Sequence, residues 1–389
     1  MQIAADSQSS VDVALGRLAR LLGFLEADPD NLNLLADVGD LALECGDLSV
    51  ARTAAVHALE LRPGDPYFSL RLSSVATAEG NFDEALAITG ELLAAGVDDP
   101  AVRYNRAYAL VCLHRFEEAK GLLLSLHAQQ ALPALVVRLL IRTHHYLGEL
   151  DEAIAVAQAY LEAEPGNGEI AGMLSLLFVD VDQLPQAQEW AQRALSLVPD
   201  NLDALLAAST VALAAEDTDA ARALAHRALA VQLRNGRVWS NLGLADMLDF
   251  EFDAAHENLT KAVHYMPEHI GTWHLLGWVQ MLHRDLDSAE ASFQQALALD
   301  DNFGETHGAL AALAAMRGDW ARADEYAKVA RRLDPESMYS RYTEVLRLQR
   351  EGRNDLVARL FDSALREGKA PGGGSLRDML NRVVSKKRD

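Results

Sequence analysis

The sequence predicts an all-α solenoid, a stack of helix pairs, and two regularities carry this prediction. The first is an alanine that recurs every 34 residues without an insertion, at Ala51, Ala85, Ala119, Ala153, Ala187, Ala221, Ala255, Ala289 and Ala323. The second is a set of prolines that lie twelve residues after members of that series, at Pro63, Pro165, Pro199, Pro267 and Pro335. A fixed period of this length is typical of repeat arrays, whose units bury their apolar faces against their neighbours.

The repeat that begins at Gly236 shows why each unit is expected to hold two helices. Its first half places apolar or small side chains on one helical face, with Trp239, Leu242 and Gly243 at i, i+3 and i+4. Its second half repeats this spacing after a turn, with Ala255, Leu259 and Ala262. Proline follows because it cannot continue a helix, so the second helix is predicted to end before Pro267.

These units resemble the tetratricopeptide repeat, whose pattern is matched at Trp273, Leu276, Gly277, Ala289, Phe293 and Ala296. Counting in steps of 34 gives ten repeats over residues 32–368, which begin at 32, 66, 100, 134, 168, 202, 236, 270, 304 and 338. The resemblance implies a right-handed superhelix of antiparallel helix pairs. Some units depart from the pattern, with serine in the glycine position at Ser73, Ser175 and Ser209.

The ends of the chain are expected to differ from the repeats. Residues 1–10 are small and polar and are expected to be disordered, whereas residues 11–31 are expected to form a capping helix that covers the first repeat. Residues 369–375 are predicted to be a Pro/Gly-rich linker, and residues 376–389 a basic amphipathic helix and tail with a capping box of Ser375 and Asp378. This last helix is expected to close the final repeat, to lie in the protein's own groove, or to bind a partner.

The composition limits the classes of partner. A formal net charge of −22 opposes general nucleic-acid binding, which relies on Lys and Arg at phosphates. It favours a basic partner, although an acidic surface also keeps a long solenoid soluble. No run of 18 apolar residues and no secretory signal occur, so membrane insertion is not predicted and a cytoplasmic location is expected. Cys45 and Cys112 lie in different repeats, and we expect them to be reduced.

No pattern in the sequence predicts catalysis, a cofactor or a metal site. The glycine-rich stretch 372–374 follows Pro371 and lacks the lysine of a phosphate-binding loop. His144 and His145 are adjacent, so on a helix they point about 100° apart and do not readily share one metal ion. The sequence therefore predicts a protein that is not an enzyme.

The expected functional surface is the groove lined by the first helices. If positions 4, 7, 8 and 11 of each first helix face the core, positions 2, 5, 9, 12 and 13 lie on another face. In tetratricopeptide repeat proteins this face lines the concave groove, where peptides and partner helices bind. The residues predicted to bind a protein or peptide there are Tyr104, Tyr108, Arg138, Arg142, His145, Leu244, Met247, His274, Trp278 and Met281.

Two parts of this face lead to specific expectations. Arg138 and Arg142, one turn apart beside a row of tyrosines, are suited to hold a carboxylate or a phosphate; otherwise they pair with acids of the protein itself or lie in solvent. Trp278 is expected either to pack against neighbouring first helices or to anchor an apolar side chain of a peptide. The carboxylate clamp of some family members is absent, because Asn105 and Asn241 lack its flanking residues.

These observations predict a non-catalytic scaffold or adaptor that binds a protein or peptide in its concave groove. One alternative is a regulatory sensor, whose superhelical pitch changes with a peptide or an anionic ligand. Another is an accessory subunit of a polysaccharide or protein export and assembly machine, a role that similar repeat proteins perform.

Overall fold

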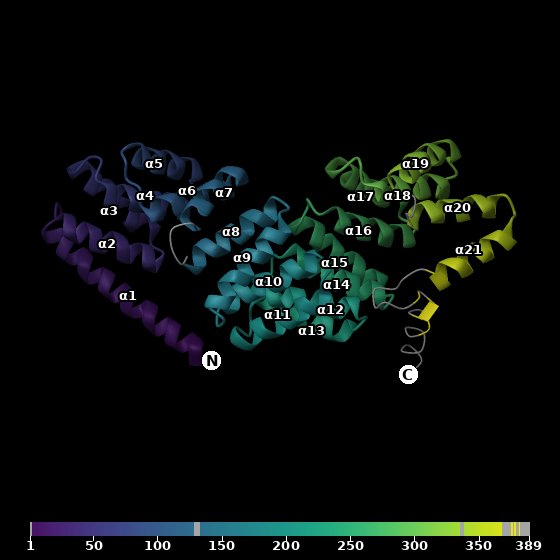
Figure 1. The fold of residues 1–389 in the computed structure, drawn as a ribbon, viewed down its shortest axis with the longest axis horizontal. Helices are drawn as coiled ribbons and strands as arrows, with labels where there is room; N and C mark the ends of the chain where they lie inside the picture. Colours follow the sequence, from purple (N-terminus) through teal and green to yellow (C-terminus); the bar gives the residue numbers. More distant parts are fainter. Residues whose placement is uncertain are drawn as a thin grey trace. The chain divides into compact units, whose positions relative to one another are not determined.

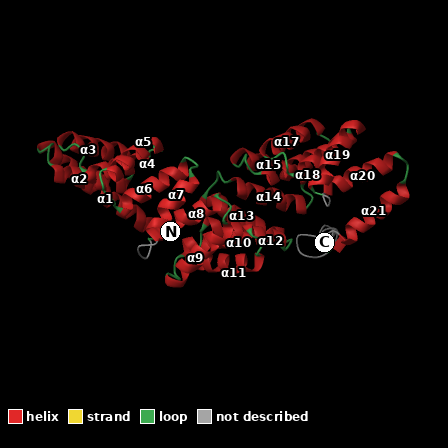
Figure 2. Ribbon diagram, turned by 45° about the horizontal axis from the view of Figure 1, so that its top comes forward, coloured by secondary structure: helices red, strands yellow, loops and turns green. Residues whose placement is uncertain are grey.

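The computed structural model describes residues 2–127, 133–334, 338–367, 375, 377–378 and 381. Within these residues every secondary-structure element is an α-helix, and there are 21 of them (Figures 1 and 2). Short turns connect successive helices into pairs. The structure therefore confirms the all-α repeat fold.

The helices belong to two compact units, Met1–Ala163 and Glu164–Asp389. Unit 1 contains α1 (Gln2–Ala27), α2 (Leu32–Cys45), α3 (Leu48–Leu61), α4 (Pro66–Ala78), α5 (Phe82–Ala94), α6 (Pro100–Cys112), α7 (Phe116–His127), α8 (Ala134–Tyr146) and α9 (Leu150–Ala163). Unit 2 contains α10 (Gly168–Asp180), α11 (Leu184–Leu197), α12 (Leu202–Ala214), α13 (Thr218–Val231), α14 (Gly236–Leu248), α15 (Phe252–Tyr265), α16 (Ile270–Leu282), α17 (Leu286–Leu299), α18 (Gly304–Met316), α19 (Trp320–Leu333), α20 (Met338–Arg350) and α21 (Asn354–Glu367).

The start of each first helix follows from capping residues in the sequence. The even-numbered helices α2 to α20 begin at the ten residues that the count of 34 gives as repeat starts. Side-chain oxygens before several of them accept hydrogen bonds from N–H groups of the first turn, at Asn31, Asp65, Asp99, Asn167, Asn201 and Asn235. Pro66 and Pro100 open α4 and α6, where a missing N–H costs no hydrogen bond.

The core of each pair lies where the two helices cross at small residues. The nine alanines of the 34-residue series are at most 1% exposed. Opposite one of them, Gly277 of α16 allows Phe293 of α17 to pack so closely that a Cβ at Gly277 would lie 2.4 Å from the ring. Where serine replaces this glycine, its hydroxyl donates to a backbone carbonyl, as Ser209 does to Ala221 at 3.1 Å. The departures from the repeat pattern therefore leave no buried hydroxyl without a partner at these positions.

The turn between the two helices of each pair requires one residue with a left-handed backbone conformation, whichever amino acid occupies that position. All ten residues at repeat position 15 have a φ between 55° and 81°, and five of them are Gly46, Gly80, Gly148, Gly318 and Gly352. The other five are not glycine: His114, Asp182, Glu216, Phe250 and Arg284. An L-residue pays a steric cost in this conformation that glycine does not.

Replacing Arg284 with glycine is therefore expected to raise the free energy of unfolding by about 1 kcal/mol. Arg284 is exposed at a φ of 62°, and it forms no ion pair with another described residue. The matched change Gly318→Ala, at the same turn of the next repeat, is expected to lower stability by a similar amount. Urea denaturation of both variants checks this, and a less stable Arg284→Gly protein would contradict it.

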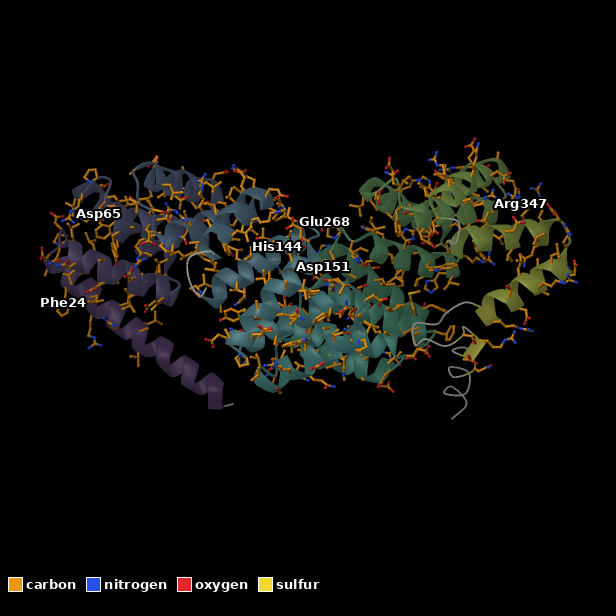
Figure 3. The ribbon with its side chains drawn as sticks, viewed as in Figure 1. Phe24, Asp65, His144, Asp151, Glu268 and Arg347 are labelled. Carbon is orange, nitrogen blue, oxygen red and sulfur yellow. The ribbon has the colours of Figure 1, made fainter. Side chains whose placement is uncertain are left out.

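The N-terminal end differs in part from the expectation. Helix α1 begins at Gln2, so the structure continues the capping helix through residues that we expected to be disordered. Residues 2–10 contain no proline or glycine, and a helix anchored further along the chain has nothing to stop it there. Leu18 of α1 is buried in the cluster that covers α2, whereas Phe24 is exposed (Figure 3).

At the C-terminal end, most of the predicted linker and tail lies outside the described residues. In the described part, the Ser375 backbone N–H donates to the Asp378 carboxylate at 3.2 Å, and the Asp378 N–H donates to the Ser375 hydroxyl at 3.2 Å. These are bonds of a capping box. Arg377 forms an ion pair with Asp362 of α21, which favours the closing role of this segment over a place in the groove.

Candidate functional site

In unit 1, the predicted groove residues lie on one continuous surface of the first helices. We call it the inner face of unit 1, and it carries the ninth residue of each first helix: Asp40, Ser74, Tyr108 and Arg142. Hydrogen bonds join the first three of its helices. The Asp40 carboxylate of α2 accepts from the Tyr67 hydroxyl of α4 at 2.7 Å, and Asn105 of α6 donates to the Ser74 hydroxyl of α4 at 2.9 Å.

The tyrosines of α6 form an apolar floor on this face. Tyr104 and Tyr108 are half-buried, their ring centroids lie 6.3 Å apart, and both pack against a core cluster that includes Leu139 and Leu140 of α8. Burial raises the pKa of the Tyr104 hydroxyl, the neighbouring Tyr108 raises it further, and the charge of Arg138 opposes the rise. Tyr104 therefore keeps its proton at neutral pH and remains a hydrogen-bond donor.

Arg138 and Arg142 of α8 stand beside this floor and are exposed. They lie one turn apart on the helix, and the charge of Arg142 reaches Cys112 on α6, where burial raises the pKa of the thiol and Arg142 lowers it. Among the described residues, no carboxylate forms an ion pair with either arginine. Elsewhere in unit 1, Arg52 binds Glu79 and Glu84 through its guanidinium group.

The two adjacent histidines of α8 have different environments. His144 is buried, and its Nδ1 lies 2.7 Å from the Glu149 carboxylate (Figure 3). His145 is exposed and stands on the side of the helix that carries Arg138 and Arg142. The inner face of unit 1 thus brings together Tyr104, Tyr108, Arg138, Arg142 and His145.

In unit 2, the predicted groove residues mostly serve packing. Leu244 and Met247 are half-buried against core clusters of their own helix and its neighbours. Met281 is only 3% exposed and belongs to the cluster of Phe293, Leu310 and Leu313. Its position in the repeat predicts a ligand contact, but its side chain packs in the core of unit 2.

Trp278 belongs to the same packed region. Its indole is half-buried against that cluster and meets the Tyr342 ring edge-on, with centroids 6.0 Å apart. Tyr342 lies on α20, two repeats further along the chain, so the two rings meet across α18. Helix α18 permits this contact because its sequence, GETHGALAALAAM, is rich in alanine and glycine. Of the two expectations for Trp278, the structure favours packing.

A second pair of residues in unit 2 also joins first helices that are two repeats apart. Arg237 of α14 forms an ion pair with Asp180 of α10, which again skips one repeat. The intervening α12 is also rich in small residues, LDALLAASTVALA. The sequence did not predict this ion pair. The repeat spacing gives the helical face of each residue, but it does not show which residues come into contact when they lie two repeats apart.

His274, another predicted groove residue, is buried and hydrogen-bonded. Its Nε2 lies 2.8 Å from the Thr306 hydroxyl of α18. Burial lowers the pKa of this imidazole from 6.5 to about 4, so the ring is neutral at pH 7. His274 therefore joins α16 to α18 and does not present a charge to a ligand.

The stability of unit 2 is expected to fall as the pH falls from about 6.5 to about 4. In this window the unfolded state binds a proton at His274 that the folded state excludes, so acid favours unfolding. Melting temperatures of the wild type and of His274→Gln across this range test the effect. The melting temperature of the variant should depend less steeply on pH than that of the wild type. The same pH dependence in both proteins would contradict the lowered pKa of His274.

The described residues offer no site for a metal ion. No group of three or more His, Cys, Asp or Glu side chains among them has a geometry that holds a metal. None of the described helices is long and apolar enough to cross a membrane.

Comparison with known proteins places two segments of the chain in one family. Family models of the tetratricopeptide repeat match residues 37–100 and 270–303. A solved structure of a monomeric IFIT1 mutant with Gppp-AAAA has a similar fold, with a TM-score of 0.57 and 13% identity over 91% of this chain and 90% of that chain. At this level of identity the likeness shows the fold alone.

Two curated relatives are members of one assembly. The BBSome complex member BBS4 of Bos taurus is 24% identical over 256 residues, which are 66% of this chain and 49% of the relative. The BBSome complex member bbs-4 of Caenorhabditis elegans is 27% identical over 121 residues, 31% of this chain and 26% of the relative. The aligned part thus spans about half of the bovine relative and about a quarter of the nematode one.

Proposed function

Since this chain is a tetratricopeptide repeat protein, we propose that it is a non-catalytic scaffold that binds a segment of another protein on the inner face of unit 1. One observation carries the proposal: the two guanidinium groups of Arg138 and Arg142 are exposed side by side and have no acidic partner among the described residues. In a protein with a net charge of −22, acids for such a pairing are abundant.

The chemistry of this surface suits an anionic group on the partner. A guanidinium group offers a planar fork of N–H donors that binds a carboxylate or a phosphate through two hydrogen bonds. Tyr104 adds a hydroxyl beside Arg138, and the half-buried rings of Tyr104 and Tyr108 offer apolar area beneath the ligand. Anionic side chains and phosphorylated residues both meet these requirements.

Two further functions have support of their own. The contacts Arg237–Asp180 and Trp278–Tyr342 hold helices two repeats apart in unit 2, which favours a sensor whose curvature responds when a ligand breaks them. The curated relatives are named as members of a complex, which favours a role as a subunit of a protein assembly machine. A cytoplasmic location stays a prediction.

Affinity capture with the full chain tests the main proposal. Proteins retained by the wild type are compared with those retained by an Arg138→Gln/Arg142→Gln variant, and mass spectrometry identifies the difference. The control variant Arg331→Gln/Arg332→Gln removes the same charge from exposed positions on α19. We expect partners that only the first variant loses. If both variants retain the same proteins as the wild type, the inner face of unit 1 is not the binding surface.

A further inference from the structure

A partly exposed aromatic cluster lies at the end of α8, which also carries the two arginines. Phe116, the first residue of α7, stacks on Tyr146, the last residue of α8, with centroids 4.8 Å apart and planes 16° apart. The His114 ring meets Phe116 edge-on at 5.6 Å. Tyr146 remains 54% exposed, so the stack buries only part of its ring. We call His114, Phe116 and Tyr146 the aromatic platform.

His114 has the left-handed backbone conformation that every repeat adopts at this turn position. His114 has a φ of 58°, in the left-handed region, at a turn where the other three turns of unit 1 have glycine. Those turns show that the connection forms at lower cost without a side chain.

The platform and the arginines lie on one side of α8. Arg138, Arg142 and Tyr146 follow one another at intervals of four residues, which places them about 6 Å apart along the helix axis and on the same face. An extended peptide places residues i and i+2 on the same side at about 6.5 to 7 Å. The distance along α8 and the distance along the peptide are therefore similar enough for two peptide side chains to contact Arg142 and Tyr146 at the same time.

We infer that the inner face of unit 1 recognises an extended segment in which an acidic residue and an aromatic residue are separated by one residue. The acid binds Arg142, and the aromatic ring packs on the open part of Tyr146. This rests on the proposed function, and it defines the partner: a segment with an acid–x–aromatic pattern. The partner's aromatic ring buries apolar surface when it packs on the exposed part of the Tyr146 ring, and this contact does not require a cavity.

Selection from a phage-displayed library of random 12-residue peptides tests this inference on the full chain. We expect enrichment of Asp or Glu two positions from Phe, Tyr or Trp. Enriched peptides should bind at least tenfold more weakly to Arg138→Gln/Arg142→Gln and to Tyr146→Leu. The control Tyr265→Leu, at the last residue of α15 in unit 2, removes a tyrosine that is 38% exposed and should bind them as the wild type does.

The variant His114→Gly separates a binding role from a folding role. Glycine relieves the strained turn, so the variant should be at least as stable as the wild type, yet it removes one ring of the platform and should bind the peptides more weakly. Unchanged peptide binding by both His114→Gly and Tyr146→Leu would overturn the inference.

The library also distinguishes this inference from the proposed function. Peptides that carry acids without a preferred aromatic residue, and that depend on Arg138 and Arg142, would overturn the acid–x–aromatic pattern and leave the proposed function in place. If no selected peptide depends on the two arginines, the proposed function fails, and this inference fails with it.

Discussion

Truncation of Trp278 to alanine is expected to lower the free energy of unfolding by about 2 to 3 kcal/mol, somewhat less than the loss typical of a fully buried tryptophan. The indole packs on the cluster of Phe293 and Leu313 and meets Tyr342 across α18, so its removal leaves a cavity between three first helices. Peptide binding by unit 1 should not change, because Trp278 lies in unit 2. Urea denaturation and peptide titration measure the two effects.

Trp190 provides the matched control. It lies on α11, half-buried like Trp278 but outside the core clusters, with the Arg193 guanidinium over its ring at 4.9 Å. A cation–π contact of this kind contributes about 0.5 to 1 kcal/mol. Trp190→Ala should therefore cost much less than Trp278→Ala. A double-mutant cycle with Tyr342→Ala should give a coupling of about 0.5 to 1.5 kcal/mol for the two rings. Equal losses for both tryptophans, or no coupling, would contradict the packing that we describe.

The Arg138→Gln/Arg142→Gln variant is expected to lose at least about tenfold in affinity for an acidic partner segment, which corresponds to about 1.4 kcal/mol. Its affinity should also depend less on salt, because screening acts on the charges that the variant has lost. Stability should change by no more than about 0.5 kcal/mol, since both side chains are exposed. Fluorescence anisotropy at several salt concentrations measures this.

The control for this prediction is again Arg331→Gln/Arg332→Gln, which should keep both the affinity and the salt dependence of the wild type. A binding constant that is insensitive to salt and to both double variants would indicate that Arg138 and Arg142 are merely solvated.

Much of the fold was predictable because its signals are local. Capping residues such as Asp65 and Asp99, followed by proline, define where first helices begin, and the repeated alanine defines where the helices cross. The left-handed turn was predictable only where glycine occupies it. His114 and Phe250 adopt the same left-handed conformation, although their side chains disfavour it. In the sequence, only their position in the 34-residue period indicates this conformation.

The candidate site was predictable in unit 1 and less so in unit 2. Positions on a helical face follow from spacing, which is why Tyr104, Arg138 and Arg142 come together as expected. Whether that face stays open depends on curvature, which spacing does not determine. The small residues of α12 and α18 are the sequence feature that could have predicted these contacts. They leave room for Arg237 and Trp278 to contact residues two repeats away.

Photo-crosslinking from two leucine positions that are both exposed tests the central claim most directly. Leu135 on α8 is 48% exposed on the side that carries Arg138 and Arg142, and Leu124 on α7 is 42% exposed on a second helix. With a photoreactive amino acid at each position in turn, we expect the captured partner to crosslink from residue 135 and not from residue 124. A partner that crosslinks from residue 124 alone, or equally from both, would show that it does not bind on the inner face of unit 1.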